Sequence, residues 1–406
     1  MQTNIIKKYL DTAKGQEADS ILRSCVHCGF CTATCPTYQL LGDELDSPRG
    51  RIYLIKQMLE GNQVSTKTQL HLDRCLTCRS CETTCPSGVQ YGRLIDIGRE
   101  FAEQQVSRSL FNKVIRFSLR KILPYPGRFS ALVKLGSMAR PVLPNSVAKK
   151  IPSLGKAPVW QKSGHPRRML VLQGCAQSVA TPDTNSATAR ILDRLGIELI
   201  AAEKAGCCGA VSHHLSAAEE GLDFMRRNID AWWPYIEQGA EAIVITASGC
   251  GVVVKDYAHL LANDPLYAAK AKKVSELSKD ISEILQAEDL SSLNKHSENR
   301  KVAFHSPCTL QHGQKLNGVV ETILTDVGFS LTPVMDPHLC CGSAGTYSIL
   351  QSDLSQQLLD NKLNSLQQGK PELIATANIG CQMHMSTKAD VPVKHWVELI
   401  DEAMAK

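Results

Sequence analysis

The sequence predicts a multidomain protein that combines α+β and α/β architecture, with a small, mostly helical N-terminal domain followed by two duplicated α/β lobes that contain parallel sheets. Three observations lead to this prediction. Two identical cysteine runs lie in the first hundred residues, a basic and proline-rich stretch follows them, and the rest contains a repeat of about 130 residues. We expect four parts, at 1–100, 101–165, 166–265 and 300–400.

The two cysteine runs have the same spacing. In each, four cysteines are separated by two, two and three residues and are followed by proline. Bacterial two-cluster ferredoxins use this spacing to bind [4Fe–4S] clusters, with the fourth cysteine of each run ligating the other cluster. The first run, within about 14–47, contains Cys25, Cys28, Cys31 and Cys35, and the second, within about 66–95, contains Cys75, Cys78, Cys81 and Cys85. We therefore assign one cluster to Cys25, Cys28, Cys31 and Cys85, and the other to Cys75, Cys78, Cys81 and Cys35.

Two other interpretations of these cysteines fit less well. A zinc ribbon has two C-x2-C pairs without a third and fourth cysteine beside each pair. A disulfide framework belongs to small secreted chains, and the first fifteen residues lack the apolar stretch of a signal peptide. No apolar run approaches the length of about 20 residues that a membrane span needs. Sixteen cysteines in such a chain indicate metal or redox work in a reducing compartment, so we expect a cytoplasmic protein.

A helix is predicted between the two runs. Ser47 and Pro48 are suited to the N-cap and first helical position, and Gly61 is suited to the end. The apolar residues recur on one face, at Ile52, Ile55, Met58 and Leu59. This helix would connect the two cysteine runs.

The predicted connector, 101–165, is strongly basic. Residues 101–170 contain fourteen Lys or Arg and a single acid, Glu103. Apolar and basic residues alternate at helical spacing, with Leu110, Phe111, Val114 and Ile115 on one face and Lys113, Arg116 and Arg120 on the other. Prolines then interrupt the segment at Pro124, Pro126, Pro141, Pro144 and Pro152. A basic amphipathic helix of this kind suits an anionic membrane surface, or else bridges domains or docks an acidic partner; no motif indicates nucleic acid.

The C-terminal part contains an internal repeat. Cys175 and Cys308 are each followed 32 residues later by a Cys-Cys-Gly doublet. The doublets are Cys207-Cys208 and Cys340-Cys341, and single cysteines, Cys250 and Cys381, follow 42 and 40 residues beyond them. Asn228 and Asn361 each lie 20 residues beyond their doublet. This period is too long for a solenoid unit and indicates two duplicated lobes.

Short apolar runs in each lobe predict buried strands that alternate with helices. The predicted strands are Met169–Leu172, Ile197–Ala201, Ala242–Ile245, Val302–Phe304 and Leu373–Ala375. Every repeated cysteine follows one of these segments, and open parallel sheets place their sites beyond the carboxyl ends of strands. We expect the eight cysteines to gather on two rims, one per lobe.

These rims could bind further iron–sulfur clusters or form thiol–disulfide couples; the alternative is that the cysteines are buried apolar residues. A histidine near the rims could replace a missing ligand, although such residues more often pack or face solvent; the candidates are His305, His312, His384 and the pair His213-His214. Trp232 and Trp233 on a predicted helix are interpreted as core or interface anchors.

The repeat resembles the cysteine-rich CCG domain of heterodisulfide reductase subunits and of several respiratory dehydrogenase subunits. In heterodisulfide reductase the pattern ends in C-x-x-C, whereas this chain has Ala247 and Asn378 at the first of these positions. The departure removes one ligand per lobe, which argues against a noncubane cluster and a heterodisulfide substrate.

The whole architecture is similar to the iron–sulfur subunits of glycolate oxidase and of anaerobic glycerol-3-phosphate dehydrogenase. The stretches closest to the glycolate oxidase family are CVHCGFCTATCPTYQLLGDELDSPRGRIYLIKQ, CLTCRSCETTCPSGV, AGCCGAV, NIDAWWP, CCGSAGTY and TANIGCQ. The resemblance implies a complex of about three different subunits, in which FAD-containing subunits oxidise glycolate to glyoxylate. It also implies attachment to the inner face of the cytoplasmic membrane, where we expect a quinone to be the acceptor.

The chain offers no catalytic residue of its own to this reaction. It has no G-x-G-x-x-G fingerprint, no P-loop and no evident general base for a hydroxy acid. We therefore predict an electron-transfer subunit that binds neither substrate nor flavin. The alternatives are an iron–sulfur subunit of a glycerol 3-phosphate or lactate dehydrogenase, a thiol–disulfide enzyme that uses the two lobes, and an adaptor whose lobes only hold partners.

Overall fold

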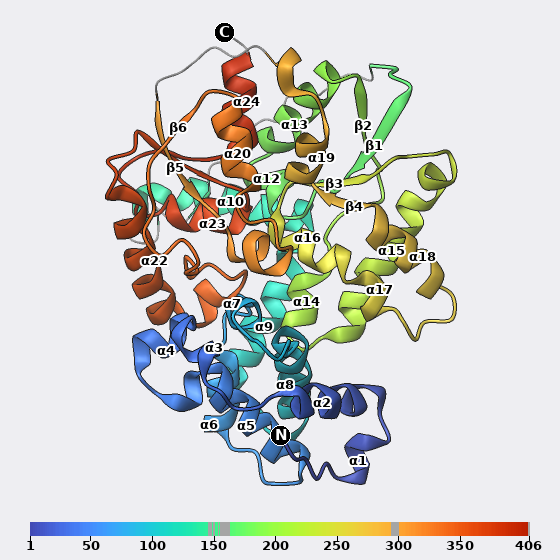
Figure 1. The fold of residues 1–406 in the computed structure, drawn as a ribbon, viewed down its shortest axis with the longest axis vertical. Helices are drawn as coiled ribbons and strands as arrows, with labels where there is room; N and C mark the ends of the chain where they lie inside the picture. The colour runs from blue at the N-terminus through green and yellow to red at the C-terminus, as the bar shows by residue number, and fades with distance from the viewer. Residues whose placement is uncertain (145–147, 149–150, 153, 155–162, 294–299, 405–406) are drawn as a thin grey trace. The chain divides into compact units, whose positions relative to one another are not determined.

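The computed structural model describes residues 1–406 except 145–147, 149–150, 153, 155–162, 294–299 and 405–406 (Figure 1). Contacts divide the chain into two compact units. The first comprises Met1–Arg116 and His338–Lys362, and the second comprises Phe117–Pro337 and Leu363–Lys406. The second cysteine doublet therefore belongs to the same compact unit as the two cysteine runs. Much of the C-terminal third of the predicted connector lies outside the described residues.

Helices make up the described part of the first unit. They are α1 (Lys7–Leu10), α2 (Ala13–Ser24), α3 (Phe30–Ala33), α4 (Pro36–Leu41), η1 (Glu44–Asp46), α5 (Pro48–Leu59), α6 (Thr66–Asp73), α7 (Ser80–Thr83), α8 (Tyr91–Gln105), α21 (Tyr347–Leu350) and the start of α22 (Ser352–Gln367). The predicted helix between the runs is α5. The Ser47 hydroxyl caps it by accepting a hydrogen bond from the Gly50 N–H at 3.0 Å, and Gly61 follows it with a φ of 92°.

The core of the first unit lies between α2, α5 and α8. Leu22, Ile55 and Leu94 come from these three helices and are fully buried. Gly98 on α8 allows the close approach of α5, because a Cβ at this position would lie 2.6 Å from the Ile55 side chain. The packed helices hold the two cysteine runs, which lie in the loops and short helices between them.

The amphipathic helix predicted in the connector is α9 (Leu110–Ile122), which is followed by α10 (Pro126–Ala139) and η2 (Arg140–Val142). No residue of α9 is buried. Its exposed apolar residues are Leu110, Phe111, Val114 and Phe117, and those of α10 are Leu132, Leu135 and Met138. Arg116 and Arg120 on the other face form ion pairs with Asp73 at 3.2 Å and Glu220 at 2.8 Å. The two helices thus present apolar side chains to solvent beside basic ones.

The first lobe contains a four-stranded parallel sheet in the order β2-β1-β3-β4. Its strands are β1 (Arg167–Val171), β2 (Ile197–Ala201), β3 (Ile243–Ile245) and β4 (Ser278–Asp280). Its helices are α12 (Gln177–Ala180), α13 (Asp183–Arg194), α14 (Ala210–His214), α15 (Ala218–Glu237), α16 (Ser248–Lys255), α17 (Tyr257–Leu260), α18 (Ala268–Leu277), α19 (Ile281–Ala287) and η3 (Leu290–Ser292).

The second lobe repeats this topology in the order β6-β5-β7-β8, again with parallel pairing. Its strands are β5 (Lys301–His305), β6 (Ser330–Leu331), β7 (Leu373–Thr376) and β8 (Val393–His395). Its helices are the π-helical turn η4 (Thr309–Gly313), α20 (Val319–Asp326), α22, α23 (Ile379–Met385) and α24 (Trp396–Met404). The predicted fold class, a helical ferredoxin-like domain with two parallel α/β lobes, is confirmed.

The strands of the first lobe bury both faces. Met169 and Val171 point into one core, while Leu170 and Leu172 point into the other, as the alternation of side chains along a strand requires. The second core is covered by α15, α16, α17 and α18. The first core also contains the strands of the second lobe together with α20 and α24, so the two sheets share it. This shared core makes the two lobes one packed body within the second unit.

The five strands predicted from apolar runs correspond to β1, β2, β3, β5 and β7. Three further strands, β4, β6 and β8, had no such signal. They are two or three residues long, and β4 reads Ser-Lys-Asp. As edge strands they need no long apolar run, since they are held by backbone pairing to one neighbour and by the helix that follows.

Candidate functional site: two cysteine-lined cavities and a thiol cluster

The cysteine runs line two cavities in the first unit. Four cysteines contributed by both runs line the first cavity together with Cys81; they are Cys25, Cys28, Cys31 and Cys85. The second cavity is lined by Cys35, Cys75, Cys78 and Cys81. The fourth cysteine of each run therefore lies in the cavity of the other run.

The two loops that present these thiols have the same unusual backbone. His27 and Gly29 in the first loop have φ values of 57° and 85°, and Thr77 and Arg79 in the second have values of 53° and 60°. A left-handed conformation is uncommon for residues other than glycine and is retained mainly where the surroundings enforce it. Placed on both sides of the second cysteine of each run, it curls the loop so that its thiols face one centre.

Hydroxyl groups and a backbone N–H around the cavities contact the sulfur atoms. The Thr37 hydroxyl lies 3.3 Å from Cys35 Sγ, and the Thr77 N–H donates to Cys75 Sγ at 3.4 Å. The Tyr91 hydroxyl lies 3.7 Å from Cys75 Sγ, and its buried ring lines both cavities. Such hydrogen bonds to sulfur are one of the means by which proteins tune iron–sulfur sites.

Burial keeps two of these thiols protonated when no metal is bound. Burial, with further contributions from Cys25 and Cys28, raises the pKa of Cys31 to about 11. Burial also raises the pKa of Cys81 well above its ordinary value. Iron–sulfur ligation requires thiolates, so binding would release protons. Two sets of four converging thiols with this environment fit a pair of [4Fe–4S] clusters.

A separate thiol cluster lies in the first α/β lobe. The side chain of Cys207 interacts with those of Cys175 and Cys208, and Cys208 interacts in turn with Cys250. The Cys207 contact and burial raise the pKa of Cys175 well above the ordinary value. The Cys207 contact lowers the pKa of Cys208, but the Cys250 contact and burial outweigh it and raise this pKa well above the ordinary value. The four cysteines that the repeat predicted to share a rim therefore meet beyond the ends of β1, β2 and β3.

Asn228 and Tyr257 fix the doublet loop of this cluster. The buried Asn228 side chain accepts from the Gly206 N–H at 2.9 Å and donates to the Cys207 carbonyl at 2.8 Å and the Tyr257 hydroxyl at 3.1 Å. The Tyr257 hydroxyl donates to the Cys208 carbonyl at 2.9 Å. The sequence repeat had marked Asn228, whereas Tyr257 carried no signal beyond its aromatic character.

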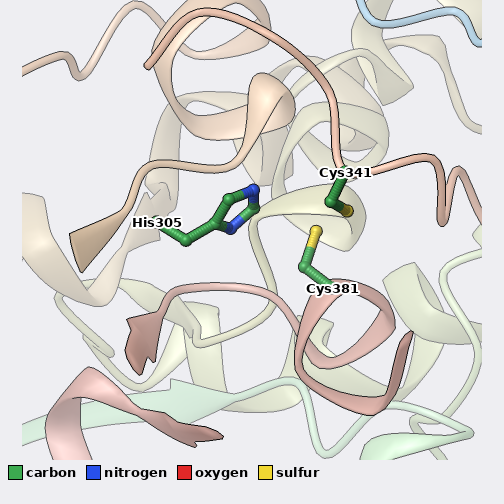
Figure 2. Close-up of side chains that lie close together, drawn as sticks. All are labelled: His305, Cys341 and Cys381. Carbon is green, nitrogen blue, oxygen red and sulfur yellow. The ribbon is translucent and has the colours of Figure 1, made fainter. Parts of the chain in front are cut away.

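The second lobe carries Cys308 after β5, the doublet Cys340-Cys341, and Cys381 on α23. Figure 2 shows Cys341, Cys381 and His305, whose potential ligand atoms all lie within 4.8 Å of one another. His305 Nδ1 lies 2.9 Å from the Thr376 hydroxyl. Among the candidate histidines, His305 thus lies beside cysteine sulfur, and its role as a ligand stays a prediction.

The other candidate residues are two buried histidines, a pair of adjacent histidines and two tryptophans. His312 and His384 are buried, and the rings of His213 and His214 pack edge to face with centroids 5.6 Å apart. Trp232 is fully buried in the outer core of the first lobe, while Trp233 is half-buried and donates to Glu237 at 2.8 Å.

Sequence reasoning missed Arg51, which lines the second cavity and is 1% exposed. Its guanidinium group donates to the His71 carbonyl at 2.7 Å, to the Thr37 hydroxyl at 3.1 Å and to Asp46 at 3.3 Å. One signal was available: Arg51 lies four residues before Ile55, on the apolar face of α5, where a charged residue is unexpected.

Comparisons with known proteins agree with this geometry. Residues 21–89 match the family described as a 4Fe-4S dicluster domain, and residues 169–255 and 302–386 each match the cysteine-rich domain called CCG. A crystal structure of a hypothetical protein from Helicobacter pylori has a similar fold, with a TM-score of 0.56 at 9% identity over 97% of this chain and 73% of the other.

Curated relatives carry more specific names. The lactate utilization protein A of Bacillus subtilis (strain 168) is 28% identical over 56% of this chain and 96% of its own length. The probable glycolate oxidase iron-sulfur subunit of the same organism is 29% identical over 94% of this chain and 92% of its own length. The glycolate oxidase iron-sulfur subunit of Escherichia coli (strain K12) is 58% identical over 100% of both chains. With this identity along its whole length, the chain belongs to the family of glycolate oxidase iron–sulfur subunits.

Proposed function

We propose that this chain is the electron-transfer subunit of a glycolate-oxidising complex. The observation that carries the proposal is the convergence of eight cysteines from two runs on two adjoining cavities. In this proposal Cys25, Cys28, Cys31 and Cys85 hold one [4Fe–4S] cluster, and Cys75, Cys78, Cys81 and Cys35 hold the other. Such clusters, when bound, supply one-electron transfer at potentials that the surrounding protein sets.

The residues of this chain would bind and insulate the redox groups. The curled loops orient three thiols of each set, and the buried Tyr91 lines both cavities. The substrate and the flavin would lie on other chains of the complex, which we expect to be FAD-containing subunits in an assembly of about three different subunits. This division of work is consistent with the lack of a dinucleotide fingerprint in the sequence.

The test is an anaerobic purification of the tagged chain with its partners from the native host. We expect bound flavin and glycolate-dependent reduction of a dye. Cys28→Ser should abolish electron delivery to the acceptor while glycolate still reduces the flavin. Thr32→Ser, which changes a neighbour of Cys31 but no sulfur, should leave electron delivery unchanged. A chain that purifies alone, or a Cys28→Ser complex with full electron delivery, would contradict the proposal.

We also propose that the thiol cluster of the first lobe binds a further iron–sulfur group or acts as a redox thiol set. Four contacting thiols, Cys175, Cys207, Cys208 and Cys250, support this proposal. The corresponding set in the second lobe is Cys308, Cys340, Cys341 and Cys381. Iron analysis of Cys207→Ser and of Cys340→Ser would separate the lobes: each variant should lose iron if its lobe holds a cluster, and should retain the full content if the thiols act without metal.

Attachment to the inner face of the cytoplasmic membrane is the last part of the proposal. None of the described helices is both long and apolar enough to cross a bilayer. The exposed apolar residues of α9 and α10, interspersed with basic residues, instead suit a peripheral contact with anionic lipid. Vesicles containing phosphatidylglycerol should pellet with the protein, and Phe111→Ser should weaken this binding several-fold. Leu266→Ser, at an equally exposed leucine elsewhere, is the matched control.

A second substrate is suggested by the relatives named for lactate utilization. They are 25–29% identical over about half of this chain. Assaying the purified complex with glycolate, lactate and glycerol 3-phosphate would decide among the substrates. Preference for glycolate supports the proposal above. Preference for lactate would instead support the second candidate function, electron transfer in a lactate-oxidising complex.

A further inference from the structure

Two cavities of similar cysteine content differ in the charge that surrounds them. In the second cavity, Arg51 is a cation within the protein interior, and the Thr37 hydroxyl connects it to a ligand sulfur: Arg51 Nη2 lies 3.1 Å from Thr37 Oγ1, which lies 3.3 Å from Cys35 Sγ. Arginine remains charged in any protein environment. A positive charge is therefore fixed two hydrogen bonds away from Cys35.

The acid that accompanies Arg51 does not cancel this charge. Asp46, which is fully buried, lies 3.3 Å from Arg51, 2.8 Å from Arg74 and 3.1 Å from His71. One buried carboxylate is thus shared between two guanidinium groups. A second acid, Asp43, has a carboxylate oxygen within 4.8 Å of Asp46 and His71, but Asp43 is exposed, so water and salt screen its charge and it does not cancel that of the buried Arg51. Arg79, which is partly exposed, also lines this cavity.

Among the described residues that line it, the first cavity has no comparable charge. Its arginine, Arg49, has a side chain 38% exposed and forms an ion pair with Glu44 at 2.7 Å. Paired and exposed charges are screened by water and salt, whereas buried ones act over several ångströms with little screening. His27, the other basic residue in the lining, is exposed, so water and salt screen any charge on its ring.

We propose that Arg51 sets the two clusters apart in potential, making the one held by Cys35, Cys75, Cys78 and Cys81 the easier to reduce. This inference rests on the proposed function, because it requires clusters in both cavities. Reduction adds negative charge, which a buried cation stabilises. An electron that enters this pair of sites would then reside at the second cavity, so that side is where electrons leave the pair.

Tyr347 lies near both the second cavity and the second cysteine doublet. This buried residue follows the second doublet by six positions, and its hydroxyl has no hydrogen-bond partner among the described residues. Burial raises the pKa of Tyr347, the Arg51 charge opposes this effect, and the cysteines Cys75 and Cys340 add to it. Tyr347 therefore lies within electrostatic range of both the second cavity and the second doublet, which all belong to the first compact unit.

The test is a potentiometric titration of the anaerobic full-length protein, followed by electron paramagnetic resonance. Wild-type protein should show two clusters that differ at least tenfold in their equilibrium constants for reduction, which corresponds to 59 mV for one electron. Arg51→Gln should lower the midpoint potential of the easier cluster by a similar amount and leave the other in place. Arg51→Lys, which retains the charge, should restore most of the difference.

Matched control variants identify which charge causes the difference in midpoint potential. Arg49→Gln, at the exposed arginine of the first cavity, should shift neither potential by as much, and Arg79→Gln should have an intermediate effect. Equal shifts for Arg51→Gln and Arg51→Lys would show a structural role and overturn the inference, as would an unchanged potential in Arg51→Gln.

If Arg51→Gln fails to fold, the inference is tested by assigning each of the two electron paramagnetic resonance signals to a cavity. Cys78→Ser should perturb the signal of the easier cluster and Cys28→Ser that of the other; the reverse assignment, or two equal potentials in wild-type protein, overturns the inference alone. Wild-type protein that shows no cluster signal would overturn the proposed function together with the inference.

Discussion

The two α/β lobes build their cysteine doublets on the same backbone but support them with different side chains. Gly209 and Gly342 have φ values of 91° and 83°, and a Cβ at these positions would lie 2.6 Å from a carbonyl oxygen of α15 and of α22, respectively. In the first lobe, Asn228 and Tyr257 hold the doublet loop. In the second, the Ser355 hydroxyl donates to the Gly342 carbonyl at 2.8 Å. The backbone geometry is therefore common to both lobes, while the polar contacts that maintain it differ.

The lobes also differ at the end of the fourth strand. Asp280 ends β4 and caps α19, where its carboxylate accepts from the Ser282 N–H at 3.0 Å. His395 ends β8 at the corresponding position, and its Nε2 lies 2.9 Å from the carbonyl oxygen of Thr246 in the first lobe. One residue thus stabilises a helix within its own lobe, while the other joins the two lobes.

The largest expected effect comes from the core that both lobes share. Trp396 is fully buried in this core, so Trp396→Ala should lower the free energy of unfolding by about 4 kcal/mol through lost packing and a cavity. Urea unfolding followed by circular dichroism measures this, and Trp233→Ala, at a half-buried position, is the control. A decrease below about 1 kcal/mol for Trp396→Ala would mean that the lobes do not depend on a common core.

The next largest effect is expected from removing the Asn228 side-chain amide, which supports the doublet loop of the first lobe. Asn228→Ala leaves the partly buried Gly206 N–H and the buried Cys207 carbonyl without their partner, so we expect a loss of about 3 kcal/mol in unfolding free energy. Asn361 occupies the same place in the repeat but is exposed, and Asn361→Ala should change stability by less than about 0.5 kcal/mol. Equal losses would show that the repeat, and not burial, predicts the role of these asparagines.

The fourth-strand residues should give opposite pH dependences. Burial lowers the pKa of His395 from 6.5 to about 4, so its contribution to stability is complete above pH 6.5 and is lost as the pH falls to 4. Burial raises the pKa of Asp280 from 3.8 to about 6, so its contribution is complete below pH 3.8 and is lost as the pH rises to 6. Each amounts to about 3 kcal/mol or less, and in the wild-type protein they largely offset each other.

Single substitutions should reveal the two contributions separately. Urea midpoints between pH 4 and 6.5 should decrease more steeply on acidification in Asp280→Asn than in wild-type protein. In His395→Gln they should decrease less or increase. The double variant should return to the wild-type slope, and a single variant that leaves the slope unchanged would refute the assignment for that residue.

The smallest effect is expected at the second doublet. Ser355→Ala removes one hydrogen bond to the Gly342 carbonyl, so we expect a loss of about 1 kcal/mol in unfolding free energy. Ser352→Ala, at an exposed position on the same helix, serves as the control. A loss equal to that of Asn228→Ala would mean that the two doublets are supported to the same degree.

Sequence reasoning succeeded where a pattern reports local structure. Apolar runs located β1, β2, β3, β5 and β7, and the Ser47-Pro48 pair located the start of α5. It failed for β4, β6 and β8, because short edge strands depend on pairing with a neighbour more than on their own composition. It also treated Asn228 and Asn361 as equivalent, since a repeat in sequence does not reveal which member is buried.

The cysteine spacing alone predicts two clusters with exchanged fourth ligands, because that spacing is a local constraint on what a loop can reach. The repeated doublets likewise predict the duplication of the lobes. The folded chain was needed to show that Arg51 is a buried cation at one cavity and Arg49 an exposed one at the other. The two residues lie two positions apart on one helix, and their difference arises from which face of α5 packs against the rest of the unit.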